Sequence, residues 1–188
     1  MLGVSVELER HRFSVEDYYQ LARAGVLRED DRVELIRGEL LVMSPIGSRH
    51  AESLRRLSRA LTVGVGDRAM VAVQDPLRMP DSEPQPDLML LSPRPGGDWE
   101  THPRPADVLM LVEVADTTVA YDREVKLPLY AEAGIPEAWL VDLVAARLEM
   151  HRGPGPDGYR QITHTRAGDT VAPTAFQDVM VEVGSLLG

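Results

Sequence analysis

Two acidic residues and one lysine are the residues of this sequence whose types and spacing are best suited to chemistry. Glu113 lies inside Val108–Val114, where every other residue is apolar. Burying a carboxylate costs free energy unless the group is paired or binds a metal ion, so Glu113 is a candidate site residue. The alternative is that Glu113 stands at the end of a strand and emerges into solvent.

Asp87 opens a second apolar run, directly after Gln85-Pro86. By itself it reads as a turn residue, because aspartate is common in turns. Two carboxylates at the ends of neighbouring strands could instead hold a divalent cation together, with water molecules as further ligands. The chain has no cysteine, so a metal ion would bind carboxylates, carbonyls or histidines, which favours Mg²⁺ or Mn²⁺.

Lys126 is the only lysine of the chain, and it follows Glu113 at a distance that lets a helix fold back over the strand end. A compact ammonium group there could position a water molecule or stabilise negative charge that develops at phosphorus. Two alternatives stay open. Lys126 could form a helical i,i+4 pair with Asp122, or chance alone could have spared one lysine.

Two further residues are candidates for the same site. His50 precedes Leu54, Leu57 and Leu61 on one face of an expected helix, so it should point inward. It is then either a histidine of the core or a site residue. Glu39, in an expected hairpin, could reach the site or could lie in an exposed strand.

Hydrophobic periodicity and turn residues predict the elements that must position these side chains. A helix starts at Ser14, where Asp17 completes a capping-box pattern, and ends before Gly25. Another helix carries Lys126, and Pro128 should kink it or confine its regular part. The expected helices cover Ser14–Ala24, Ser48–Val63 and Asp122–Ala133. The expected strands are Val33–Ile36, Glu39–Met43, Ala69–Gln74, Asp87–Leu91, Val108–Ala115, Glu137–Asp142, Arg147–Arg152, Tyr159–His164 and Val179–Val183.

This order of elements predicts an α/β fold, with a mixed β-sheet core flanked by helices and an N-terminal helix and hairpin. Residues 93–106 contain four prolines and should form a loop. With 188 residues and no long linker, one domain over residues 1–188 is expected. The chain lacks cysteine and asparagine, a trend of thermophilic proteins, although its arginine content could reflect genome base composition.

Net charge is the main feature that argues against a nucleic-acid partner, because the chain carries −10 and phosphate binding is driven by lysine and arginine. Four arginines crowd one expected helix, where they form either a solvated face or a local phosphate-binding patch. They are Arg49, Arg55, Arg56 and Arg59. Without an apolar run of about 20 residues or an apolar leader in Met1–Arg10, a cytoplasmic protein with no membrane contact is expected.

Several motifs, in their order and spacing, resemble the Uma2 family, also labelled DUF820, from about residue 13 to residue 183. They are Val33–Leu40, Met43-Ser44-Pro45 with His50, Gln85–Leu88, Leu111–Val114, Tyr121–Tyr130 with Lys126, and Ala133–Glu137 with Trp139 and Asp142. The resemblance implies the restriction-endonuclease-like fold of the PD-(D/E)XK superfamily. Pro86-Asp87 would supply the PD and Glu113 the acidic member.

The sequence departs from the PD-(D/E)XK pattern where a lysine would be expected two residues after Glu113, because Ala115 is there. The resemblance implies that the lysine has moved to the helix, as Lys126. It also implies a DNA endonuclease that depends on Mg²⁺ or Mn²⁺.

The leading hypothesis is therefore metal-dependent hydrolysis of phosphodiester bonds in DNA. Asp87, Glu113 and the Val114 carbonyl would bind the metal, Lys126 would orient the attacking water, and Glu39 and His50 would be secondary catalytic candidates. A non-catalytic binding or assembly module on the same fold is the alternative, and another phosphate ester is a possible substrate. A homodimer is expected if both strands of a duplex are cut.

Overall fold

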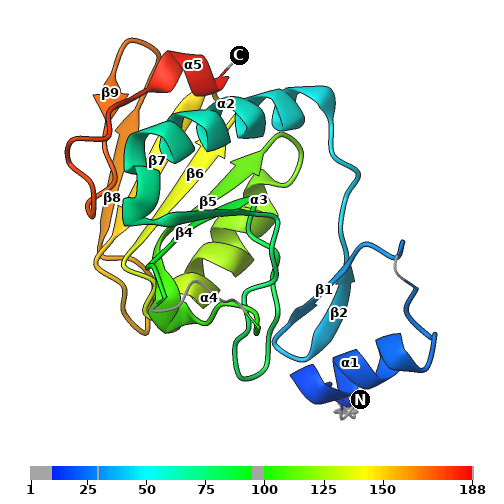
Figure 1. Ribbon diagram of the computed structural model, residues 1–188. Coiled ribbons are helices and arrows are strands. Elements are labelled where there is room, and N and C mark those ends of the chain that lie inside the picture. Colours follow the sequence, from blue (N-terminus) through cyan, green and yellow to red (C-terminus); the bar gives the residue numbers. More distant parts are fainter. Residues whose placement is uncertain (1–9, 29, 95–99, 188) are drawn as a thin grey trace, which may run out of the picture.

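The computed structural model describes residues 10–28, 30–94 and 100–187. Its centre is a six-stranded sheet in the order β3-β4-β5-β6-β7-β8, in which β5 and β6 run parallel and every other neighbouring pair is antiparallel (Figure 1). The strands are β3 Met70–Val73, β4 Leu88–Leu91, β5 Val108–Ala115, β6 Glu137–Asp142, β7 Arg147–Arg152 and β8 Gln161–Thr165.

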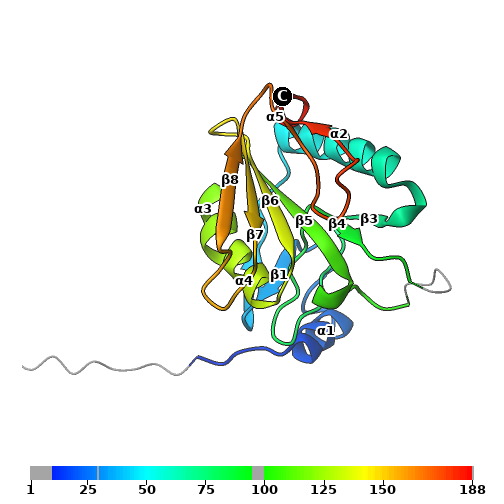
Figure 2. The ribbon, with the colours of Figure 1, turned by 90° about the vertical axis from the view of Figure 1, so that its left-hand side faces the viewer.

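Helices cover both faces of this sheet (Figures 1 and 2). One apolar core lies under α2 (Ser48–Val65) and α5 (Val183–Leu187), and it includes Trp139. A second core, on the other face, lies under α4 (Leu127–Glu132) and includes Tyr130. Strands that are covered on both faces need apolar side chains on both, which explains the continuous apolar runs of β4, β5 and β6.

The parallel pair β5 and β6 requires a crossover connection, and this connection carries Lys126. It consists of α3 (Val119–Tyr121), a π-helical segment η3 (Asp122–Lys126) and α4. The sequence predicts one helix over Asp122–Ala133, which Pro128 should kink or confine in its regular part; the regular helix α4 indeed begins only at Leu127. The structure places the irregularity before Pro128, which has no N–H to donate and cannot continue regular helical bonding. The Leu127 N–H instead bonds to the Asp122 carbonyl, five residues back.

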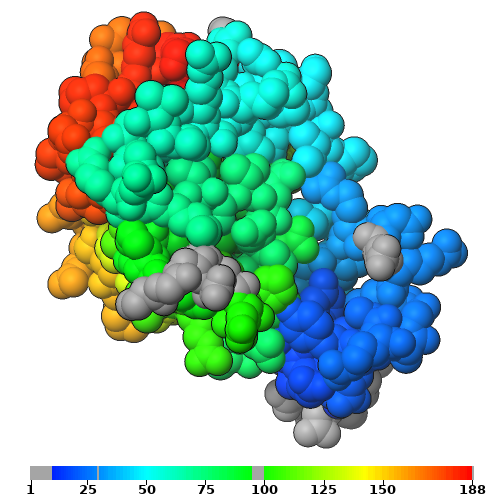
Figure 3. All heavy atoms as spheres, viewed as in Figure 1, coloured from blue at the N-terminus to red at the C-terminus, as the bar shows by residue number. Residues whose placement is uncertain are grey.

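The N-terminal part forms a separate layer beside the sheet. Helix α1 (Val15–Arg23) begins at a capping box between Ser14 and Asp17, as predicted. The hairpin of β1 (Val33–Ile36) and β2 (Glu39–Val42) also forms as predicted. Figure 3 shows these elements, in blue, gathered at one side of the molecule. A bridge between Leu35 and Glu83 ties the hairpin to the chain ahead of β4.

Several boundaries differ from the sequence-based prediction. Helix α2 continues to Val65, two residues beyond its expected end. The last expected strand is only Val181–Glu182 (β10), which pairs with the unpredicted β9, Thr170–Val171. The unpredicted helix α5 follows at once. These short elements carry too few residues for a periodic signal, and packing against α2 and the sheet decides them. Residues 95–99 of the expected loop lie outside the described residues.

No helix in the described part of the chain is long and apolar enough to cross a membrane.

Candidate active site

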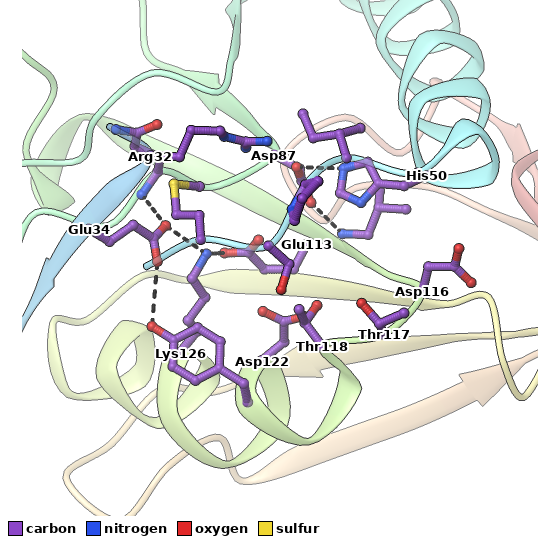
Figure 4. A pocket seen from close by; sticks show the side chains of 18 of the residues that line it. Arg32, Glu34, His50, Asp87, Glu113, Asp116, Thr117, Thr118, Asp122 and Lys126 are labelled. Carbon is purple, nitrogen blue, oxygen red and sulfur yellow. Dashed lines mark hydrogen bonds and ion pairs between the residues drawn. The ribbon is translucent and has the colours of Figure 1, made fainter. Parts of the chain in front are cut away.

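A pocket of about 580 Å³ opens between the hairpin, the start of α2, the ends of β4 and β5, and the crossover. Asp87, Glu113 and Lys126 all line it, together with His50 and Asp122 (Figure 4). The sheet brings them together because β4 and β5 are neighbours, with Leu88 paired to Val112. The helix that follows β5 then folds back over the strand end.

Asp87 is held from several sides although it is only 7% exposed. The Val114 N–H donates to Oδ2 of Asp87 at 2.8 Å, and the Gln74 amide donates to Oδ1 at 3.2 Å. Nε2 of His50 lies 2.9 Å from the same Oδ1. The carboxylate is therefore fixed directly before β4, at the edge of the pocket.

Lys126 is buried between two carboxylates. Its Nζ lies 3.1 Å from Oε1 of Glu113 and 3.0 Å from Oε1 of Glu34 (Figure 4). The Tyr130 hydroxyl also donates to Oε1 of Glu113, at 2.5 Å. Glu113 is 3% exposed, so it does not emerge into solvent at the strand end. Its free-energy cost of burial is offset by these two donors.

Asp122 and Lys126 begin and end the π-helical segment η3, and both line the pocket. A π-helix bonds from residue i to i+5 and changes the angular spacing of its side chains, and such segments are frequent at functional sites. Both side chains are buried. The Asp122 carboxylate accepts from the Thr118 hydroxyl at 2.6 Å, while Lys126 pairs with Glu34 and Glu113. The isolated helical pair between Asp122 and Lys126 is therefore not the arrangement found.

The pocket holds more buried negative charge than positive charge. Burial raises the pKa of Glu113 well above its ordinary value, and Asp122, Asp87 and Glu34 raise it further against the opposing effect of Lys126. Burial alone would lower the pKa of Lys126, but the surrounding carboxylates, Glu113 first, outweigh it and raise that pKa. Lys126 is thus an ammonium group at neutral pH.

Two other groups of the pocket titrate away from their ordinary ranges. Burial raises the pKa of Asp122 to about 6, with Asp87 and Glu34 adding to the shift while Lys126 and Thr118 oppose it. Burial would lower the pKa of His50, but its bond to Asp87 and the nearby acidic residues reverse this effect and raise the pKa. His50 therefore does not lie wholly within the core: it lines the pocket and bonds to Asp87.

The structure separates one predicted residue from this site. Glu39 does not line the pocket; its half-exposed carboxylate lies 3.2 Å from the Arg12 guanidinium. Glu34, on the paired strand of the same hairpin, takes the place expected of Glu39. Glu34 lies within the Val33–Leu40 motif but is not among the site residues predicted from the sequence, although a glutamate between Val33 and Leu35 is the same kind of signal as Glu113.

Three of the four arginines on α2 form hydrogen bonds or ion pairs with other groups of the protein. Arg55 and Arg56 both bond to Glu52 one turn away, and Arg49 bonds to Asp116 and to the Leu143 carbonyl. This arrangement matches the solvated-face alternative for Arg55 and Arg56, whereas Arg49 contacts groups outside the helix.

The oxygen donors of the pocket fit a hard divalent cation in kind and in charge. Four buried carboxylates face one buried ammonium group; they belong to Glu34, Asp87, Glu113 and Asp122. In the side-chain positions seen, no three acidic or histidine side chains within residues 10–28, 30–94 and 100–187 converge as a ligand set. Asp87 and Glu113 instead face protein donors, so a cation would have to replace some of these contacts. Val114 contributes its N–H to Asp87, and a role for its carbonyl stays a prediction.

Comparison with known proteins agrees with this architecture. The Uma2 family model, described as "Putative restriction endonuclease", matches residues 15–184. A crystal structure of a "putative nuclease belonging to DUF820" from Anabaena variabilis matches with a TM-score of 0.73 at 13% identity, over 93% of this chain and 97% of that chain. The search of curated proteins gave no match. The predicted restriction-endonuclease-like fold is therefore confirmed.

Proposed function

The chain belongs to the Uma2 family, and from this premise we propose that it is an endonuclease that hydrolyses phosphodiester bonds in DNA with the help of Mg²⁺ or Mn²⁺. One observation carries the proposal: the buried ammonium of Lys126 contacts Glu113 in the same pocket that holds Asp87. Restriction-endonuclease-like sites need two acidic residues and a lysine at one place, and here three distant parts of the chain supply them.

Asp87, Glu113 and the Val114 carbonyl would hold the cation. A bound divalent cation supplies Lewis-acid polarisation of the phosphate and lowers the pKa of water. The protein's own groups do the rest. Lys126, as an ammonium group, orients the attacking water and stabilises negative charge at phosphorus. His50 and Gln74 fix the Asp87 carboxylate by bonding to Oδ1, which keeps Oδ2 on the Val114 N–H.

Supercoiled-plasmid cleavage in Mg²⁺ or Mn²⁺ tests this function. We expect nicking or linearisation by the wild-type chain, and a loss of at least about 100-fold in Asp87→Asn and Lys126→Met, since each removes a group that acts at the reacting phosphate. Glu39→Gln is the control, because Glu39 is a carboxylate of the β1–β2 hairpin that does not line the pocket. Cleavage that persists in both pocket variants would refute the assignment.

A non-catalytic module on the same fold is the second candidate, and it is favoured by the net charge of −10 and by carboxylates that already have protein partners. Calorimetric titration with Mn²⁺ separates the two functions. The nuclease proposal requires binding that disappears in Asp87→Asn and in Glu113→Gln.

A further inference from the structure

Glu34 is one of two buried acidic residues of the pocket, with Asp122, to which the proposed function assigns no role. It lies on β1, in the N-terminal hairpin rather than in the six-stranded sheet, and is 2% exposed. Its Oε1 lies 3.0 Å from Nζ of Lys126. A carboxylate from a separate layer of the molecule thus contacts the lysine on the side away from Glu113 (Figure 4).

Glu34 is fixed on both of its oxygens by groups that belong to the protein. The Gln85 N–H donates to Oε1 at 2.8 Å, and the Tyr121 hydroxyl lies 3.4 Å from Oε2. The backbone of the hairpin is anchored as well, because the Glu83 N–H bonds to the Leu35 carbonyl and the Gly38 N–H to the Asp81 carbonyl. Glu34 therefore cannot turn to another partner without breaking several bonds.

Glu113 differs from Glu34, because two positively charged groups can bind its carboxylate. In the structure it pairs with Lys126, whereas in the proposed function it is a ligand of the cation. A cation and an ammonium group at one carboxylate repel each other in a poorly solvated pocket. When Glu113 turns to the cation, Lys126 loses one of its two carboxylates.

We propose that Glu34 is a positioning residue of the active site, which retains the Lys126 ammonium in the pocket when a divalent cation takes Glu113. This inference rests on the proposed function. It assigns to the hairpin a part in the site: its buried carboxylate keeps the lysine beside the substrate phosphate, while Glu113 changes partner. Loss of the Glu34 charge should leave Lys126 without a partner in the loaded site.

The single lysine makes the test direct. Protein labelled with ¹⁵N only at lysine side chains gives one ammonium signal, which needs no assignment. A buried, paired ammonium exchanges its protons slowly with water, because exchange requires local opening. In the wild-type chain we expect slow exchange both without and with saturating Mg²⁺. In Glu34→Gln we expect slow exchange without Mg²⁺ and an increase of about tenfold or more once Mg²⁺ is bound.

Glu113→Gln provides a second test that needs no cation and does not depend on the folding of the Glu34 variant. This substitution removes the carboxylate charge that the cation would bind. The ammonium protons should still exchange slowly with water, because Lys126 stays paired with Glu34. Glu137→Gln is the matched control: Glu137 is a buried carboxylate paired with Arg152 outside the pocket, and its loss should leave the lysine signal unchanged. Cleavage kinetics add a readout: Glu34→Gln should lower kcat with little change in KM, and Glu34→Asp should restore part of kcat.

The outcomes separate the two proposals. Mg²⁺ binding with unchanged slow exchange in Glu34→Gln, or rapid exchange in Glu113→Gln, would overturn the role of Glu34 and leave the nuclease proposal standing. If titration of the wild-type chain with Mg²⁺ gave no heat of binding and no change in the chemical shift of the lysine ammonium signal, the proposed function would be overturned, and this inference with it.

Discussion

Asp122 should cost the metal-free protein stability at neutral pH, and its replacement by asparagine measures how much. The pKa of its carboxyl rises from an ordinary value of 3.8 to about 6 on folding, chiefly because burial disfavours the charged form. At about 1.4 kcal/mol for each pKa unit, this rise corresponds to about 3 kcal/mol. The Asp122→Asn substitution keeps the shape of the side chain and an oxygen that accepts from Thr118.

The sign follows from where the proton is bound. Below pH 3.8 the carboxyl is protonated in both the folded and the unfolded state, so it has no effect. Between pH 3.8 and about 6 the unfolded state releases its proton first, and stability falls as the pH rises. Above this window the full cost is present. Asp122→Asn should therefore be more stable than the wild type by about 3 kcal/mol at pH 8 and by about 1 kcal/mol at pH 4.5.

Urea unfolding followed by circular dichroism, in EDTA at both pH values, checks this prediction. Asp107→Asn is a control of opposite sign: hydrogen bonds from Arg94 and from the Arg104 N–H lower the pKa of Asp107 despite its burial, so that variant should be destabilised at pH 8. The reasoning would be refuted by an Asp122→Asn variant that is less stable than the wild type at pH 8, or by a difference that does not depend on pH.

Three further variants test other parts of the structure. Lys126→Met leaves buried carboxylates without their cation, so the free energy of unfolding at pH 8 should fall by about 3 kcal/mol in urea unfolding; an unchanged value would contradict the buried pairs. Gly64→Ala would drive a methyl group into the Val179 side chain, so a loss of about 1 kcal/mol is expected despite the better helix propensity of alanine, and a raised Tm would count against that contact. Glu39→Gln should keep plasmid cleavage within about twofold, because its carboxylate pairs with Arg12 outside the pocket; a large loss would return Glu39 to the site.

The main elements and the principal residues of the pocket could be predicted from the sequence. The capping box at Ser14 and the apolar runs of β4, β5 and β6 are local patterns, and local patterns follow from propensity and burial. Glu113 stood out because an acidic residue inside an apolar run is costly to bury. Its meeting with Asp87 and Lys126 followed from the predicted order of strand and crossover helix.

The way in which the N-terminal hairpin meets this pocket could not be predicted from the sequence, because it depends on contacts between distant parts of the chain. Both Glu34 and Glu39 lie in the hairpin, and sequence reasoning chose Glu39; the register and the bridge at Leu35 turn Glu34 inward instead. The π-helical turn before Pro128 was likewise beyond local pattern, because the carboxylates that pair with its Lys126 come from β1 and β5. Which carboxylate reaches the lysine depends on contacts between residues about 90 positions apart, and no local propensity encodes those contacts.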